Sequence, residues 1–149
     1  MEDFWPEIFK NKALWVTLLS WSIAQGTKII IGLFQGKKFN FYWVLRTGGL
    51  PSAHSAAVVA LACSLGKELG FYSPYFAVGA ILALITMFDA QTWRRYIGVQ
   101  ARILNRMMDD LQEGKKIEEN RLKELVGHTP LEVIAGAFVG VVTTVMFYQ

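Results

Sequence analysis

The chain has few of the side chains that most often cross-link proteins or bind metals. Its 149 residues include one cysteine, Cys63, and two histidines, His54 and His128. A single cysteine can form neither an internal disulfide nor a cysteine-rich metal site. Because imidazole readily exchanges a proton near neutral pH, the two histidines are the first candidates for chemistry.

Charged side chains are also scarce. They make up 18% of the chain, whereas hydrophobic residues make up 53%, and the mean hydropathy is +0.32. Such a sequence is too apolar for an ordinary soluble domain of this length. Apolar stretches at 14–34, 52–69, 73–89 and 131–148 each approach the roughly 20 residues that cross a bilayer. We therefore expect an all-α integral membrane protein, a single domain over residues 1–149 with about four transmembrane helices.

The sequence lacks the signals of cleavage and of nucleic-acid binding. Its first residues, Met1 to Trp5, are acidic and offer no small-residue cleavage site, so we expect the first apolar stretch to be retained. The net charge is only +3, and the basic residues form no stripe with interleaved aromatics. Membrane lipids, and not nucleic acid, are the expected partners.

A polar segment at about 99–127 interrupts the apolar stretches. Its apolar side chains recur at helical spacing, while its charged side chains face elsewhere. The apolar set is Val99, Ile103, Leu104, Met107, Met108 and Leu111, and the charged set is Arg102, Arg106, Asp109 and Asp110. We expect an amphipathic helical insertion, followed after Lys115-Lys116 by a second short helix.

Alternating spans bring ionisable residues to one membrane face. Lys28 lies toward the end of the first span, His54 begins the second, Asp89 and Arg94 close the third, and His128 begins the fourth. Ionisable groups in or beside spans are costly and usually mark a functional interior. The alternative is snorkelling or pairing between helices.

The distribution of basic residues predicts which face this is. The face with the histidines also carries Lys37, Lys38, Arg46, Arg94, Arg95, Arg102, Arg106, Lys115, Lys116, Arg121 and Lys123. The opposite face has Lys10, Lys12 and Lys67. The positive-inside rule therefore predicts a site on the cytoplasmic face, most simply of a bacterial plasma membrane.

Both histidines stand where an apolar helix is expected to begin, a position that favours bound anions. His128 and Glu132 are four residues apart, so the carboxylate could orient the imidazole, although an ordinary ion pair at a helix start has the same spacing. His54 follows Ser52, a good helix-capping residue, so this string could equally be plain helix initiation. We expect a phosphate-binding site in the membrane.

Two short strings resemble the motifs of the type 2 phosphatidic acid phosphatase superfamily. Pro51-Ser52-Ala53-His54-Ser55 is similar to its Pro-Ser-Gly-His block. The family's third block is Ser-Arg, five residues, His, three residues, Asp. Here the string from Trp93 to Gln100 resembles its first half, with Gln100 where His is expected, and the string from His128 to Gly136 resembles its second half. The closest resemblance is to a divergent branch of small membrane proteins related to acid phosphatases and vanadium-dependent haloperoxidases.

This resemblance implies a role for each matching residue. His128 would be the nucleophile, Glu132, in place of Asp, its orienting carboxylate, and His54 the general acid. Ser52 and Arg94 would bind phosphate. The family's first block, Lys, six residues, then Arg-Pro, is matched poorly, because seven residues lie between Lys38 and Arg46 and no proline follows Arg46.

Three further residues are assigned by charge and position. Lys28 is preferred as the phosphate-binding lysine because a lysine in an apolar span requires a partner, with Lys38 and Arg46 as alternatives. Arg95 is a second anion ligand or a headgroup contact. Asp89 is expected to brace Lys28 or the arginines. The alternative, a metal cluster with Asp109, Asp110 and Glu113, is disfavoured, and neither a metal nor another cofactor is expected.

The resemblance and the residues together predict a metal-independent lipid phosphatase that forms a phosphohistidine intermediate. The first guess for its substrate is phosphatidylglycerophosphate. The alternative is a catalytically inactive, anionic-lipid-binding or regulatory protein of the same fold, which Gln100 and the split third block would favour. A vanadate-dependent haloperoxidase fits a short membrane chain less well.

Overall fold

The computed structural model describes residues 4–36, 49–111 and 128–148, with only the backbone described at residues 4, 93–95, 110 and 111. These residues form α-helices and no strand. The helices are α1 (Phe4–Lys10), α2 (Lys12–Phe34), α4 (Ala53–Leu69), α5 (Pro74–Gln91), α6 (Trp93–Leu111) and α7 (Pro130–Phe147). The expectation of an all-α membrane protein is confirmed.

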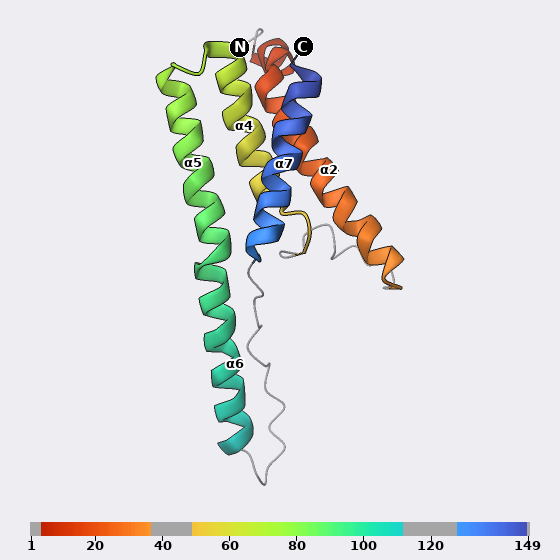
Figure 1. Ribbon diagram of the computed structural model, residues 1–149, viewed down its shortest axis with the longest axis vertical. Coiled ribbons are helices and arrows are strands. Elements are labelled where there is room, and N and C mark those ends of the chain that lie inside the picture. The colour runs from red at the N-terminus through yellow and green to blue at the C-terminus, as the bar shows by residue number, and fades with distance from the viewer. Residues whose placement is uncertain (1–3, 37–48, 112–127, 149) are drawn as a thin grey trace.

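The long helices alternate in direction (Figure 1). α2 runs away from the end of the molecule that holds both termini, α4 returns, α5 runs away again and α7 returns. The beginnings of α4 and α7 and the end of α5 therefore meet at the opposite end, which we call the site end. α6 continues beyond the site end in nearly the direction of α5.

The number of helices long enough to span a bilayer differs from the sequence prediction. Three stretches of the described chain have the length and composition of a span: Lys12–Phe34, Pro74–Asp109 across α5 and α6, and Pro130–Phe147. α4, the expected second span, has 17 residues. At about 1.5 Å per residue it is roughly 26 Å long, slightly less than the hydrocarbon thickness.

α4 is the central helix of the bundle and contacts α2, α5 and α7. Its buried side chains are small and include Ala53, Ala56 and Ala60. Two hydroxyls from neighbouring helices donate to its backbone: Ser20 Oγ to the Ala56 carbonyl at 3.1 Å, and Thr144 Oγ1 to the Ala60 carbonyl at 3.3 Å. Close backbone approach through small residues is how helices associate in lipid.

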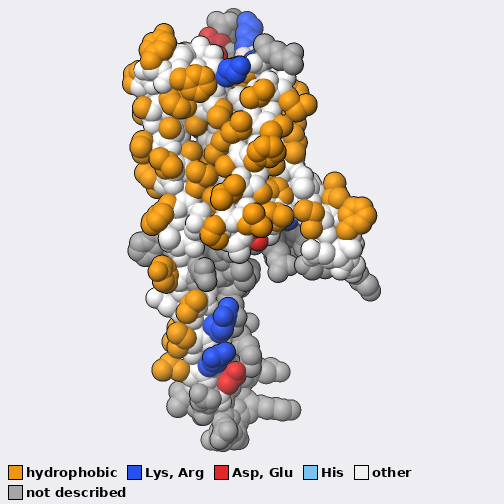
Figure 2. Space-filling view, viewed as in Figure 1, with side chains coloured by type: hydrophobic (Ala, Val, Ile, Leu, Met, Phe, Trp, Pro, Cys, Tyr) orange, Lys and Arg blue, Asp and Glu red, His pale blue; other side chains and the backbone are white. Residues whose placement is uncertain are grey.

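The large apolar side chains lie on the outside of the bundle (Figure 2). Phe88 and Ile85 of α5 and Phe138 of α7 each expose more than 60% of their surface. Such an exterior would be unfavourable in water but is the expected lining against acyl chains. The distribution of side-chain sizes thus supports a membrane location independently of helix length.

α6 is amphipathic, as the sequence predicts. Ile103, Leu104 and Met107 form an exposed apolar stripe at helical spacing, and Arg102 and Arg106 are also exposed. Figure 2 shows basic side chains beside the apolar ones at this end of the molecule. The helix begins at Trp93, six residues earlier than the expected start of the insertion at Val99. The second short helix expected in the insertion lies outside the described residues.

Close packing between α7 and α4 depends on two glycines. A Cβ atom at Gly136 would clash with the Ser52 carbonyl oxygen, and one at Gly140 would lie 2.6 Å from the Ala56 oxygen and 2.9 Å from the Ala60 nitrogen. These are backbone atoms of a helix and cannot move aside cheaply. By contrast, Gly26 of α2 has no neighbouring atom within 4 Å of such a Cβ.

We predict that Gly140→Ala destabilises the bundle by about 1–3 kcal/mol, the usual cost of overpacking. The matched control, Gly26→Ala, should be neutral or slightly stabilising because alanine favours a helix by up to about 1 kcal/mol. Thermal unfolding in detergent micelles, followed by circular dichroism, measures both. Equal losses in the two variants would contradict the proposed close approach of α7 to α4.

Candidate active site

The structure brings the two histidines together at the site end. His54 lies in the first turn of α4, and His128 stands two residues before α7. Their ring centroids are 6.4 Å apart, with an angle of 62° between the ring planes. The His128 residue is 2% exposed, whereas His54 is half-buried. Both imidazoles can therefore reach one small group placed between them.

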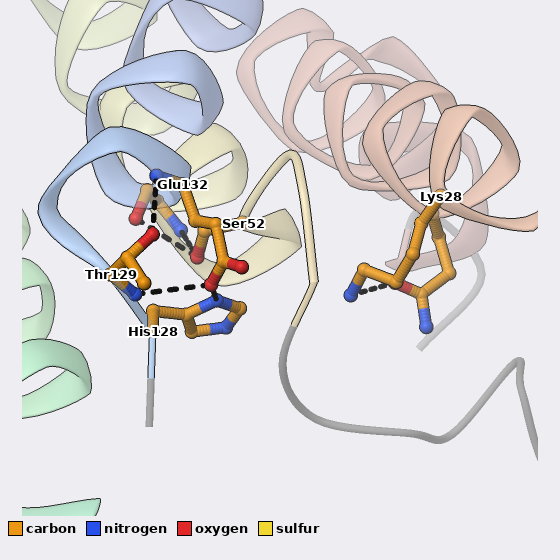
Figure 3. A network of polar contacts seen from close by, with 7 residues as sticks. Lys28, Ser52, His128, Thr129 and Glu132 are labelled. Atoms are coloured by element: carbon orange, nitrogen blue, oxygen red, sulfur yellow. Dashed lines mark hydrogen bonds and ion pairs between the residues drawn. The ribbon is translucent and has the colours of Figure 1, made fainter. Parts of the chain in front are cut away.

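Glu132 holds the His128 ring through the cap of α7 (Figure 3). Its Oε2 atom lies 3.0 Å from His128 Nδ1 and accepts a hydrogen bond of 3.1 Å from the Thr129 backbone N–H. In return, Thr129 Oγ1 accepts a bond of 3.3 Å from the Glu132 N–H, which completes a capping box. A carboxylate only accepts, so Nδ1 carries a proton, and in the neutral ring Nε2 then holds the lone pair.

Two backbone hydrogen bonds fix the start of α7 to its neighbours. The His128 N–H donates to the Ala90 carbonyl at 3.0 Å, and the Ser52 N–H donates to the Glu132 carbonyl at 2.9 Å. The first bond joins α7 to the end of α5, and the second joins it to the start of α4. The positions of both histidines are thus set by backbone contacts between three helices.

Ser52 is fully buried and acts as the N-cap of α4. Its Oγ atom accepts from the Ser55 hydroxyl at 3.0 Å and from the Ser55 backbone N–H at 3.4 Å. This is the helix-initiation role that the sequence left open. A role for Ser52 in binding phosphate stays a prediction.

Lys28 extends from α2 toward the His128–Glu132 pair (Figure 3). Its Nζ atom donates to Gln25 Oε1 at 3.0 Å, and its aliphatic stem lies against the backbone of Gly49. The ammonium and the Glu132 carboxylate attract each other across the space between α2 and α7. Gln25 was missed in the sequence, although a glutamine inside an apolar span is itself a signal because an unpaired amide is costly there.

Of the other expected site residues, Asp89 has a described side chain. It is exposed on α5 and forms no ion pair within the described part of the chain. The described bond of the Lys28 ammonium is to Gln25, and a bracing role of Asp89 toward Lys28 or the arginines stays a prediction. Arg94 and Arg95 lie in the first turn of α6, and their side chains are outside the described residues.

The alternative phosphate ligands and most of the alternative metal cluster lie outside the described residues. Lys38 and Arg46 fall outside the described residues, as do Asp110, except for its backbone, and Glu113. Among the side chains that are described, no three His, Cys, Asp or Glu residues lie close enough to hold a metal ion.

A cavity of about 450 Å³ adjoins His128 on the side of α5 and α6. The described residues that line it are Gln91, Thr92, Tyr96, Val99, His128 and Pro130. It has the size of a small-molecule site, typically about 300–1,000 Å³. The site end thus holds space beside the buried histidine as well as the polar cluster itself.

We predict that Glu132 fixes the tautomer of His128. Nitrogen-15 histidine labelling gives only two ring systems, His54 and His128, so long-range proton–nitrogen correlation spectra can be assigned with single variants. Wild-type His128 should carry its proton on Nδ1, and Glu132→Ala should shift it toward the Nε2–H form, since the acceptor is lost. Glu68→Ala, at the opposite end of the bundle, is the control. An Nε2–H tautomer in the wild type would contradict the assignment.

Comparison with known proteins identifies the family. Residues 9–143 match the family described as the Divergent PAP2 family. The chain is 38% identical over 151 aligned residues to the "Uncharacterized membrane protein YuiD" of Bacillus subtilis (strain 168), covering 94% of this chain and 96% of that protein. No solved structure matches the chain. The match over nearly the whole chain means that this protein belongs to the Divergent PAP2 family.

Proposed function

We propose that the protein is a lipid phosphate phosphatase that works through a phosphohistidine intermediate. The observation that supports this most is the approach of the two histidine rings to 6.4 Å, with Glu132 bonded to the Nδ1 atom of one of them. One ring is thereby prepared to attack through Nε2, and the second lies within reach of the same group. Membership of a phosphatase-related membrane family agrees with this chemistry.

In the first step, Nε2 of His128 attacks the phosphorus of a phosphate monoester. A bond forms between nitrogen and phosphorus, the bond from phosphorus to the ester oxygen breaks, and His54 donates a proton to the departing alkoxide. The Glu132 carboxylate stabilises the positive charge that develops on the His128 ring. In the second step His54 takes a proton from water, the water oxygen forms a bond to phosphorus, and the bond between phosphorus and Nε2 breaks. Its electron pair returns to His128, and inorganic phosphate is released.

The negative charge of the phosphoryl group needs cations and N–H donors around it. Lys28 supplies an ammonium group on the α2 side of the cluster, and Arg94 and Arg95 are the candidates from α6. The beginnings of α4 and α7 add the positive ends of two helix dipoles. Groups of this kind stabilise a transition state most where little water is present, and His128 is 2% exposed.

A lipid substrate follows from the position of the cluster at the end of a membrane bundle. The distribution of basic residues favours the cytoplasmic face, where phosphatidylglycerophosphate is the first candidate for the substrate. A cysteine introduced at Asp109 in a Cys63→Ala background should be protected from a membrane-impermeant thiol reagent added outside intact cells. Labelling from outside would place the site on the other face.

We predict that the purified protein releases phosphate from one or more of a panel of lipid phosphates. His128→Ala should abolish turnover, and His54→Ala should lower it by about 10²–10⁴-fold, the usual contribution of a general acid. Glu132→Gln should retain a slower enzyme, because the orientation of the ring and not the attacking atom is lost. Glu68→Gln is the matched control and should leave the rate unchanged.

Two other results would change the proposal. Full activity of His128→Ala would exclude the phosphohistidine mechanism. Binding of lipid phosphates without any turnover would favour the alternative function, an anionic-lipid-binding protein. That alternative rests on the split third block and on Gln100, which stands where the family motif has histidine and is exposed on α6.

A further inference from the structure

The strongest unexplained feature outside the histidine cluster is the apolar stripe of α6. Apolar and polar side chains are segregated far more sharply on α6 than on α2, α5 or α7. Val99, Ile103 and Met107 expose 42%, 51% and 56% of their surface. Val99, at the start of the stripe, also lines the cavity beside His128, whereas Ile103 and Met107 lie beyond the described lining of that cavity.

The position of α6 indicates what covers the stripe. The helix begins directly after the apolar helix α5, so we expect its first turn at the membrane surface. Because α6 is joined to α5 through a single residue, its first turn stays close to the lipid headgroups. The first turn of α6 contains Trp93, Arg94 and Arg95. This combination of aromatic and basic residues is typical of the membrane interface.

The charges beside the stripe are suited to an anionic lipid surface. The described charged side chains of α6 are Arg102, Arg106 and Asp109, all exposed, so basic groups outnumber acidic ones there; the two arginines are one helical turn apart. A strongly amphipathic helix with basic residues on its polar side is the type that lies in the plane of the interface. In a parallel pair of α6 helices from two copies, the same arginines would approach each other, which disfavours a second copy as the occupant.

Thr92 is the one residue between α5 and α6, and its backbone continues the helical hydrogen bonds to Phe88 and from Tyr96. Its Oγ1 atom also donates to the Phe88 carbonyl at 2.8 Å. Such a bond from a threonine to the carbonyl four residues earlier often bends a helix. The continuation of α6 along the axis of α5 therefore depends on a single joint.

We infer that α6 is a membrane-surface helix that binds the anionic headgroups of the leaflet around the site end. Its apolar stripe enters the boundary between headgroups and acyl chains, and Arg102 and Arg106 contact lipid phosphates. This role does not depend on phosphatase activity. It would hold the end of α5, and with it the cavity beside His128, at the lipid surface.

Depth-dependent fluorescence quenching tests this inference. In a Cys63→Ala background, single cysteines at Ile103 and Arg102 carry an environment-sensitive fluorophore, and the protein is placed in nanodiscs containing lipids brominated on their acyl chains. The label at 103 should be quenched at least several-fold more than the label at 102. Quenching at 103 should be stronger in phosphatidylglycerol than in phosphatidylcholine nanodiscs and should decrease with salt, because headgroup contacts are electrostatic.

Charge-reversal variants test whether Arg106 contributes to binding of the anionic headgroups. Arg106→Glu should reduce quenching at 103 in phosphatidylglycerol nanodiscs, whereas Lys67→Glu, an exposed lysine near the opposite end of the bundle, should not. Equal quenching at 102 and 103, or none at either, would overturn the inference. Disulfide formation between position 103 of two copies without lipid quenching would also overturn it and would assign the stripe to a second copy. These readouts need no turnover, so an inactive protein would leave the inference standing.

Discussion

The contact between the first turns of α4 and α7 is the constraint on which the site depends. The Glu132 carbonyl accepts the Ser52 N–H, while the Glu132 carboxylate caps α7 and holds His128. One residue thus joins two helices, completes one helix terminus and orients one imidazole. Gly136 allows this approach, since any side chain there would meet the Ser52 carbonyl. The geometry of the candidate site is therefore inseparable from the packing of the bundle.

The distribution of side-chain sizes explains why the bundle can carry such a site in lipid. Small residues of α4 let three helices come close, and hydroxyls such as those of Ser20 and Thr144 are bonded to backbone carbonyls. Polar atoms inside a membrane are tolerated only when they are paired or used. At the site end the polar groups converge from α2, α4 and α7, which leaves Lys28 facing Glu132.

Much of this arrangement is predictable from the sequence, and the remainder depends on tertiary contacts. Apolar stretches and their alternation predict the helices and the shared end of His54 and His128. The cap of α7 had a signal in Thr129 and Glu132, because a threonine followed three residues later by a glutamate is typical of a capping box. The length of α4 agrees with the predicted stretch 52–69, and the bond between Gln25 and Lys28 had a signal in their spacing of three residues on one helix. The bonds from the Ser52 N–H to the Glu132 carbonyl and from the His128 N–H to the Ala90 carbonyl could not be derived, since they depend on how separate helices pack against one another.

The central claim is that His128 becomes covalently phosphorylated during turnover. The most direct measurement is rapid quenching of the wild-type protein with a lipid phosphate whose phosphoryl group is radiolabelled, followed by peptide mapping. The account predicts a label that is stable in alkali, labile in acid, located on the peptide with His128 and absent from His128→Ala. Steady release of phosphate with no label trapped on that peptide, at times that resolve single turnovers, would contradict it.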